Sequence, residues 1–245
     1  MKTALITGAS RGIGRAAALR LAESAAYPLI CITAHTRENA LQELKEEILS
    51  RYPGQSVLCS LGDAGDPSYA RQLKEQLSAA GGTVRLLVNN AAISFHGLLM
   101  DQTPEEWDRV IRTNLSSLYN MCHTFIHDLM STKDGRIINI SSVWGAVGAS
   151  CEVAYSAAKG GVNSFTRALA KELAPSGIAV NCLQMGVVDT DMNRNLSEED
   201  RAALADEIPF GRFIAPEEAA EAIYHLSEMP ACLTGSVIRM DGGWY

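Results

Sequence analysis

The sequence predicts a single doubly wound α/β domain, in which a parallel sheet is covered by helices on both faces. Short apolar runs typical of buried strands alternate with helical patterns along nearly the whole chain. This alternation favours right-handed strand–helix–strand units and therefore parallel strands. The chain has 245 residues, of which 47% are hydrophobic, so it is long enough to bury a large core. We therefore expect residues 1–245 to form one domain around a seven-stranded sheet.

Each expected strand is a short apolar run, and each expected helix fills the interval before the next run. The strands are Thr3–Thr7, Leu29–Ala34, Ser56–Ser60, Arg85–Asn89, Arg136–Ser141, Ala179–Gln184 and Ser236–Met240. The helical patterns cover residues 12–25, 38–51, 67–80, 104–131, 155–174 and 216–228. Ligands of such sheets bind beyond the carboxyl ends of the strands, so functional residues are expected in the loops that follow each strand.

Composition argues against several classes of protein. The net charge is −7, from 21 basic and 28 acidic residues, whereas nucleic-acid binding normally needs a basic patch. No apolar stretch approaches the roughly 18 residues of a membrane span, and the first residues do not resemble a signal peptide. The six cysteines show no CxxC spacing. We expect reduced, mostly buried thiols in a cytoplasmic protein that binds neither nucleic acid nor membrane.

The first strand leads directly into a glycine-rich loop, Thr7–Gly14. Its three glycines allow the backbone to turn sharply and to approach a pyrophosphate, and the helix that begins near Gly12 directs free N–H groups at that anion. A glycine loop between a strand and a helix is the context of a Rossmann-type dinucleotide site. The residues expected to bind the cofactor are Gly8, Ser10, Arg11, Gly12, Ile13 and Gly14. The alternative is a tight turn without a ligand.

The end of the second strand indicates which dinucleotide is bound. NAD-binding domains usually place an acid there to hold the ribose 2′-hydroxyl, but no acid precedes Glu38 in this chain. Arg11 and Arg37, with Thr36 and His35 nearby, are suited to surround a 2′-phosphate instead. The sequence therefore predicts NADP(H) rather than NAD as the cofactor. The alternative for Arg37 is an ordinary surface position at the start of a helix.

Further markers follow in a fixed order along the chain: Asp63, Asn89-Asn90-Ala91, Asn114, Ser142, Tyr155 with Lys159, and Thr190. With the glycine loop, they make the chain resemble the short-chain dehydrogenases/reductases over essentially its whole length. Within that family it is most similar to the 3-oxoacyl-[acyl-carrier-protein] reductases, in residues 113–117, 189–192 and 241–245. The chain departs from the family pattern at Ala92, where glycine is usual, and at Met185, where proline is usual. We expect strain if φ of Ala92 is positive, and a looser nicotinamide wall at Met185.

The expected reacting groups come from the fifth strand and the helix that follows it. Tyr155 and Lys159 are four residues apart, so they lie on the same face of that helix. Ser142 follows the strand whose carboxyl end lies close to the start of the helix, so the three side chains can converge. If the register of the strand is shifted by one residue, Ser141 faces the pocket instead. The positive charge of Lys159 is expected to lower the pKa of Tyr155.

The family resemblance implies a role for each of these groups. Tyr155 donates the proton in ketone reduction, and Ser142 hydrogen-bonds the substrate oxygen. Lys159 also binds the nicotinamide ribose, and Asn114 holds a water that relays protons to it. The resemblance further assigns Asp63 to the adenine, Thr190 to the carboxamide, and other positions to the lining of the dinucleotide site; those positions are Ile13, Asn90 and Val188.

Three other features complete the expected site. Cys151 and Glu152 precede Tyr155 and either border the substrate pocket or lie in a loop without contact. Residues 191–214, with a short helix over 197–207, look like the family's mobile lid. Its apolar residues suit an acyl chain or packing onto the body of the protein; they are Met192, Leu196, Leu204, Ile208 and Phe210. His123 and His127 have a spacing found in metal sites, but no third ligand is evident, so no metal is expected. The family instead uses this helix for contacts between subunits of a homotetramer.

The family resemblance, together with the end of the second strand, implies an NADPH-dependent ketone reductase, with a 3-oxoacyl group on acyl carrier protein as the expected substrate and fatty acid synthesis as its pathway. One feature argues against this substrate. Carrier proteins are acidic, whereas residues 197–228 contain nine acidic and only two basic residues. Candidates for a compensating basic patch are Arg109, Arg112, Lys133 and Arg136. The alternatives are an enzyme for a free sugar, steroid or hydroxy acid, and a family member that binds the nucleotide without catalysis.

Overall fold

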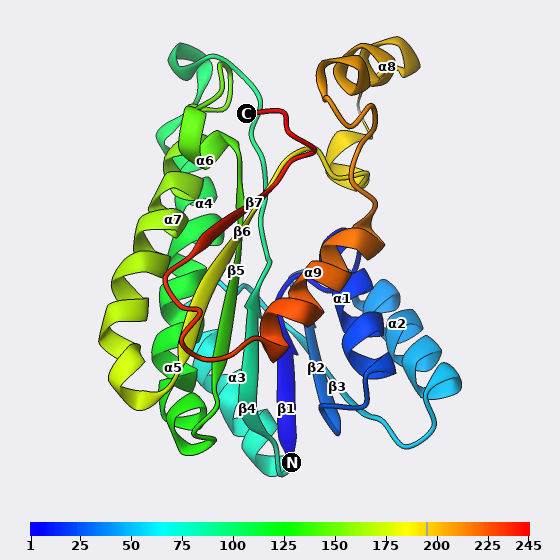
Figure 1. The fold of residues 1–245 in the computed structure, drawn as a ribbon, viewed down its shortest axis with the longest axis vertical. Helices are drawn as coiled ribbons and strands as arrows, with labels where there is room; N and C mark the ends of the chain where they lie inside the picture. Colours follow the sequence, from blue (N-terminus) through cyan, green and yellow to red (C-terminus); the bar gives the residue numbers. More distant parts are fainter. Residues whose placement is uncertain (195) are drawn as a thin grey trace.

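The computed structural model describes residues 1–194 and 196–245, in which seven parallel strands form one sheet. The strands are β1 Lys2–Ile6, β2 Leu29–Ala34, β3 Ser56–Leu61, β4 Thr83–Asn89, β5 Arg136–Ser142, β6 Ala179–Met185 and β7 Val237–Met240. Their order in the sheet is β3-β2-β1-β4-β5-β6-β7 (Figure 1). The predicted doubly wound α/β fold is confirmed. From β1 the chain adds strands on one side as far as β3, and from β4 it adds them on the other side. The strand order therefore reverses between β1 and β4, and such sheets bind ligands at this position.

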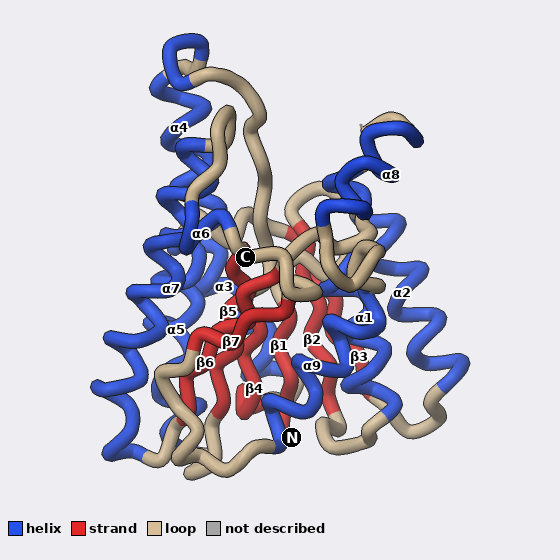
Figure 2. The backbone as a smooth tube through the Cα atoms, turned by 45° about the horizontal axis from the view of Figure 1, so that its top comes forward, coloured by secondary structure: helices blue, strands red, loops and turns tan. Residues whose placement is uncertain are grey.

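The helices lie on both faces of the sheet (Figures 1 and 2). Helices α1 Gly12–Glu23, α2 Glu38–Arg51 and α9 Pro216–Glu228 pack on one face, and α3 Pro67–Ala79, α5 Ser117–Ser131 and α7 Val153–Leu173 pack on the other. The shorter helices are α4 Pro104–Ile111, α6 Trp144–Val147 and α8 Glu198–Glu207. Among the described residues, no helix has the length and apolarity that crossing a bilayer requires.

Two apolar layers hold the helices to the sheet. Leu21 of α1 and Ile30 of β2 belong to one layer, and Leu73 of α3 and Phe125 of α5 belong to the other; none of these four side chains is exposed. All six residues of β2 are buried, as expected for a strand covered on both faces. Burial of each large apolar side chain stabilises the fold by about 1.5–3 kcal/mol. These layers fix the positions of the strand ends where the candidate site lies.

The helix expected over residues 104–131 is interrupted. Helix α4 ends at Ile111, a π-helical turn covers Arg112–Ser116, and α5 begins at Ser117. Within this turn the side chain of Asn114 donates to the carbonyl oxygen of Ile93 and accepts from its N–H, both at 2.8 Å. A π-helical turn inserts one extra residue into a helix and is frequent at functional sites. The pairing with Ile93 lies outside the helix, so helical periodicity alone does not predict the interruption.

All six cysteines are free thiols. Cys31, Cys122 and Cys182 are buried, Cys59 and Cys151 are partly exposed, and Cys232 is exposed. The expectation of mostly buried thiols therefore holds for half of them.

Candidate active site

The glycine loop forms a cradle next to the ends of β1 and β4. Gly8 and Gly12 have φ of +67° and +54°, a region in which side chains are disfavoured. A Cβ on Gly8 would lie 2.8 Å from the Cα of Ala91, and one on Gly14 would lie 2.4 Å from the carbonyl oxygen of Gly8. Helix α1 begins at Gly12 without a side-chain cap, so its first N–H groups remain available to an anion.

Asn90 holds this loop in place from the end of β4. Its side-chain amide donates to the carbonyl oxygens of Thr7 at 2.9 Å and Gly8 at 3.1 Å. In return, the hydroxyl of Thr7 accepts from the N–H groups of Asn90 at 3.0 Å and Ala91 at 3.1 Å. Asn90 therefore positions the loop, in addition to the dinucleotide contact expected of it.

The remaining expected cofactor residues surround the same strand ends. A Cβ on Gly12 would lie 3.1 Å from the methyl group of Thr190, so these two residues are in close contact. Ser10 lies in the loop, and Ile13 packs against the core from the first turn of α1. Val188 forms a bridge with Ile214.

Thr36 and Arg37 are exposed residues after β2, and Asp63 follows β3. The Asp63 carboxylate accepts from the N–H of Gly65 at 2.8 Å and lies 3.3 Å from the Arg112 guanidinium.

Ser142, Tyr155 and Lys159 come together beyond the carboxyl end of β5. Ser142 is the last residue of this strand, and the other two lie in the first two turns of α7. The three side chains are buried, with 8%, 9% and 3% of their residue surface exposed. The Lys159 ammonium lies 5.6 Å from the centre of the Tyr155 ring and donates to the carbonyl oxygen of Ile140 at 2.8 Å. The expected convergence of the three groups is therefore present.

The register of β5 separates Ser142 from Ser141. The hydroxyl of Ser141 donates to the carbonyl oxygen of Lys159 at 3.1 Å and so ties the strand to α7. The hydroxyl of Ser142 accepts from the N–H of Trp144 at 3.2 Å. Hydrogen bonding by the same hydroxyl lowers the pKa of Tyr155. Accepting one bond leaves the O–H of Ser142 free to donate. Of the two serines, Ser142 is the one placed beside the phenol.

Burial dominates the titration of the two ionisable groups. Burial raises the pKa of Tyr155, and the carboxylate of Glu152 raises it further, while the Ser142 hydroxyl lowers it. Burial also lowers the pKa of Lys159 to about 8, against a smaller opposing effect of Cys182. The expected net lowering of the Tyr155 pKa by Lys159 is therefore wrong, because removal from water disfavours the charged form of both groups.

Asn114 is completely buried, and both polar atoms of its side-chain amide are bonded to Ile93. The amide itself anchors the loop that follows β4.

The two departures from the family pattern cause no distortion. Among the described residues, the non-glycine residues with positive φ are Ala25, Lys133 and Cys151, so Ala92 is not strained. Met185 is buried, and it pairs with Ser142 on one side and Met240 on the other. These pairings place Met185 within the sheet, at the position of the usual proline.

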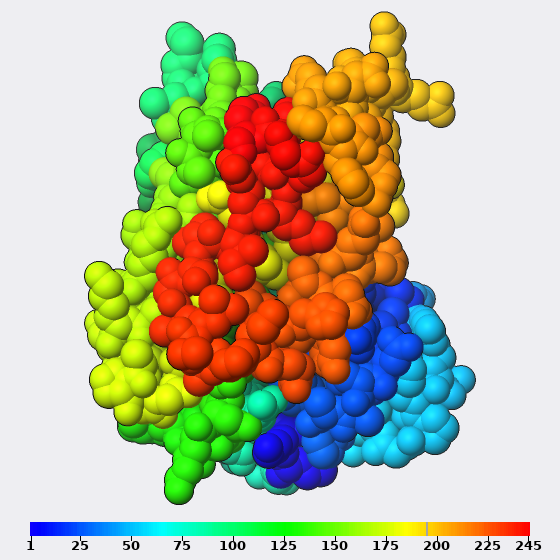
Figure 3. Space-filling view, viewed as in Figure 1, coloured from blue at the N-terminus to red at the C-terminus, as the bar shows by residue number. Residues whose placement is uncertain are grey.

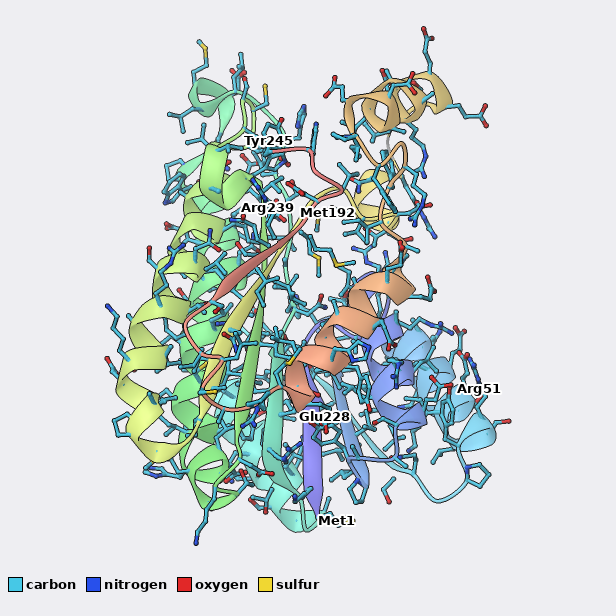
Figure 4. The ribbon with its side chains drawn as sticks, in the orientation of Figure 1. Met1, Arg51, Met192, Glu228, Arg239 and Tyr245 are labelled. Carbon is cyan, nitrogen blue, oxygen red and sulfur yellow. The ribbon has the colours of Figure 1, made fainter. Side chains whose placement is uncertain are left out.

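Several features near the site were not predicted from the sequence. The rings of Trp144, Trp244 and Tyr245 contact one another in edge-on and tilted arrangements, with centroid distances of 4.6–5.4 Å. Trp144 lies two residues after Ser142 in the chain. The Asp241 carboxylate accepts from the N–H groups of Gly243 and Tyr245, and this fixes the segment that carries two of the rings. Figure 3 shows this segment between the helices on one side and the region of α8 on the other, and Figure 4 labels Tyr245. The sequence signal that could have indicated this aromatic cluster is the adjacent pair Trp244 and Tyr245.

The loop before Tyr155 is in contact with the site. Ser94 donates to the carboxylate of Glu152 at 2.6 Å, and this carboxylate acts on the phenol of Tyr155. Cys151 has φ of +63°, and its carbonyl oxygen accepts from the N–H of Gly97 at 2.8 Å. The loop after β4 and the start of α7 are therefore joined.

The short helix expected near residue 200 is present as α8, and the hydroxyl of Ser197 caps it by accepting from the N–H of Asp200 at 3.1 Å. Of the apolar residues in the expected lid, Ile208 is buried, whereas Met192 and Phe210 are 43% and 63% exposed. The expected lid includes Asn195, which lies outside the described residues.

The four basic residues considered for a carrier-protein patch do not form one surface. Lys133 and Arg136 lie at the start of β5, at the opposite end of this strand from Ser142. Arg136 is buried and donates to backbone carbonyl oxygens of Asp134 and Gly135. Of the four candidates for the basic patch, Arg109 on α4 and Arg112 in the π-helical turn remain. Within residues 1–194 and 196–245, no group of three metal-ligating side chains converges.

Comparison with known proteins agrees with this geometry. A family model described as short chain dehydrogenase matches residues 2–201. The chain is 39% identical over 245 residues to the 3-oxoacyl-[acyl-carrier-protein] reductase FabG of Escherichia coli (strain K12), covering all of this chain and 97% of that protein. It is 38% identical over 244 residues to the enzyme of the same name from Chlamydia trachomatis, covering 99% and 96%.

A similar solved structure is an NADPH-bound short chain oxidoreductase from Pseudomonas aeruginosa PAO1, described as having an atypical catalytic center. The TM-score is 0.92 at 31% identity, and the match covers 99% of this chain and 96% of that one.

Proposed function

Because the chain belongs to the short-chain dehydrogenase family, and is therefore an oxidoreductase that uses a nicotinamide cofactor, we propose that it reduces a ketone to a secondary alcohol with NADPH. The observation that carries this proposal is the convergence of Ser142, Tyr155 and Lys159 in a buried position beyond β5. All the reacting residues are present, which argues against a nucleotide-binding protein without catalysis. Steady oxidation of NADPH by any ketone would eliminate that alternative.

The glycine loop fits the expected dinucleotide. Side chains at Gly8 or Gly14 would collide with backbone, and the uncapped start of α1 supplies free N–H groups for the pyrophosphate. Lys159 is proposed to hold the nicotinamide ribose, and Thr190 the carboxamide. When bound, the reduced nicotinamide supplies a hydride, while the protein provides orientation and electrostatics.

The reacting side chains then have distinct tasks. Ser142 donates its free O–H to the substrate oxygen and stabilises the negative charge that develops there. Tyr155, held neutral by its raised pKa, donates its proton to the same oxygen. In its protonated form, Lys159 is proposed to offset part of the rise in the Tyr155 pKa that burial causes, without reversing it. A water bound by the main chain at Asn114 is proposed to relay protons to Lys159.

Arg37 is proposed to contact the cofactor 2′-phosphate. Replacement by glutamine (Arg37→Gln) should raise KM for NADPH by about tenfold, because a charge-assisted hydrogen bond is lost. KM for NADH should change little, since a 2′-hydroxyl makes no such contact. Steady-state kinetics with both cofactors tests this, with Arg51→Gln at the other end of α2 as the control. A wild-type protein with a higher kcat/KM for NADH than for NADPH would contradict the assignment of NADP.

The carboxylate of Glu152 should shift the pH dependence of the reverse reaction, in addition to the larger effect of burial. Alcohol oxidation needs Tyr155 as a base, so the reaction follows ionisation of the phenol. Because Glu152 raises the pKa of Tyr155, Glu152→Gln should lower it and shift the pH–rate profile for oxidation to lower pH. The control is Glu172→Gln, at the far end of α7. An unshifted or alkaline-shifted profile would argue against the electrostatic effect.

The proposed substrate is a 3-oxoacyl group on acyl carrier protein, as in fatty acid synthesis, on the basis of similarity to enzymes of that name. An acetoacetyl thioester should be reduced, with rates increased by the carrier protein and decreased by salt. The second candidate is a free small ketone or alcohol. It is favoured by the acidic start of α8, at Glu198, Glu199 and Asp200, because this surface would repel an acidic carrier. Activity on small ketones without any effect of carrier protein would favour the second candidate.

We also propose a single domain over residues 1–245, a lid formed by residues 191–214, a homotetramer and a cytoplasmic location. Tyr119 and His123 lie with their rings 5.3 Å apart on α5, the helix proposed to contact other subunits. Sedimentation analysis of the purified chain tests the assembly.

A further inference from the structure

Asp191 lies where three positively charged side chains meet. Its Oδ2 accepts from Nη1 of Arg11 at 3.1 Å and from Nη1 of Arg37 at 3.4 Å, and its Oδ1 is 2.5 Å from Nη2 of Arg194. The Asp191 side chain is only 14% exposed, whereas those of Arg11 and Arg37 are 46% and 49% exposed. A single carboxylate therefore occupies the common binding position of the three guanidinium groups.

These arginines come from separate parts of the chain. Arg11 belongs to the glycine loop, directly before α1, and Arg37 lies between β2 and α2. Asp191 and Arg194 follow Thr190, which contacts Gly12. Guanidinium groups form charge-assisted hydrogen bonds with phosphate oxygens as they do with carboxylate oxygens. Asp191 thus takes the place on Arg11 and Arg37 that a phosphate oxygen would take.

We propose that Asp191 is a specificity-determining residue that competes with the cofactor 2′-phosphate for Arg11 and Arg37. The inference rests on the proposed binding of a 2′-phosphate by these two residues. A phosphate must either displace the carboxylate from both guanidinium groups or bind beside it against repulsion between like charges. A cofactor with a 2′-hydroxyl meets neither obstacle. Asp191 therefore weakens the binding of NADPH but not that of NADH, and so reduces the difference between the affinities of the protein for the two cofactors.

The ionisation of Asp191 supports this competition. Burial acts to raise the pKa of this carboxyl, but Arg11, Arg194 and Arg37 together outweigh it, so the pKa lies below its usual value. The carboxylate is consequently charged at neutral pH, when the cofactor binds.

The test is the ratio of the Kd of NADPH to the Kd of NADH in the protein of residues 1–245; a lower ratio means a stronger preference for NADPH. NADPH and NADH are titrated separately, at one salt concentration, by the fluorescence of the dihydronicotinamide. In Asp191→Asn, the Kd of NADPH should fall about three- to tenfold, because two partly exposed ion pairs no longer compete. The Kd of NADH should change by less than about twofold, as expected for a surface contact that this ligand does not use.

The matched control is Asp189→Asn. It removes the same charge two residues earlier, where the carboxylate pairs with Arg201 at 2.9 Å and lies outside the Asp191 cluster. This control should leave the ratio unchanged. In a protein that also carries Arg11→Gln and Arg37→Gln, Asp191→Asn should lose its effect, because the groups competed for are absent.

The possible results separate this inference from the proposed cofactor. If Asp191→Asn leaves the ratio of the Kd of NADPH to that of NADH unchanged, or raises it, the competition is refuted. If the wild-type protein binds NADH more tightly than NADPH but Asp191→Asn lowers the ratio, the competition is supported and the assignment of NADP is refuted. Each ratio is measured within one variant, so a loss of stability that affects both titrations equally cannot imitate the expected shift.

Discussion

Tyr155→Phe is expected to abolish ketone reduction while cofactor binding stays close to that of the wild type. The substitution removes one oxygen atom from a side chain that is 9% exposed and leaves its packing in place. General acid catalysis contributes about 10²–10⁴-fold to a rate, so we expect kcat to fall by about 10³-fold or more. The measurement is the decrease of NADPH absorbance with a ketone, together with a fluorescence titration of NADPH.

The control makes the same chemical change far from β5 and α7. Tyr52 lies at the end of α2, and Tyr52→Phe should leave turnover unchanged. If Tyr155→Phe retained turnover, the role of this residue as proton donor would be refuted. If it lost NADPH binding as well, its effect could not be assigned to proton transfer.

Ser142→Ala should have the second-largest effect, and Ser141→Ala should have a different one. Loss of a single group that stabilises a developing oxyanion costs about 10²–10³-fold in kcat. Ser141 instead donates to the carbonyl oxygen of Lys159. Its removal should lower the free energy of unfolding by about 1 kcal/mol and leave turnover within a few-fold of the wild type. The measurements are kcat and the denaturant midpoint for both variants.

The two serine variants also test the strand register. Each loses one hydroxyl from a buried position at the end of β5, so they are well matched. A loss of kcat in Ser141→Ala as large as that in Ser142→Ala would contradict the placement of Ser142 beside the phenol.

The fold and the convergence of the reacting groups were predictable because their signals are local. The glycine loop follows a strand and opens a helix, and Tyr155 and Lys159 are one helical turn apart. The carboxyl end of β5 then has to lie near the start of α7. These relations follow from the chain order of a parallel sheet and do not depend on the details of packing.

The features that escaped prediction depend on contacts between distant residues. The π-helical turn at Asn114 accompanies hydrogen bonds to Ile93, and the cluster at Asp191 brings together arginines from three segments. The direction of the Tyr155 pKa shift depends on burial, which a sequence does not reveal. The φ of Ala92 could not be predicted either, because the family's glycine does not by itself establish a positive φ.

The central claim is that this buried group of a phenol, an ammonium and a hydroxyl reduces a ketone carbon. The most direct test is a single-turnover reaction with NADPH that carries deuterium at both C4 positions of the dihydropyridine, with an acetoacetyl thioester as the ketone. The account predicts that one of these two deuterium atoms is transferred as deuteride, so that the 3-hydroxyacyl product carries deuterium at C3, as measured by mass spectrometry and NMR. Oxidation of NADPH without deuterium in the product, or no reaction with any ketone, would contradict it.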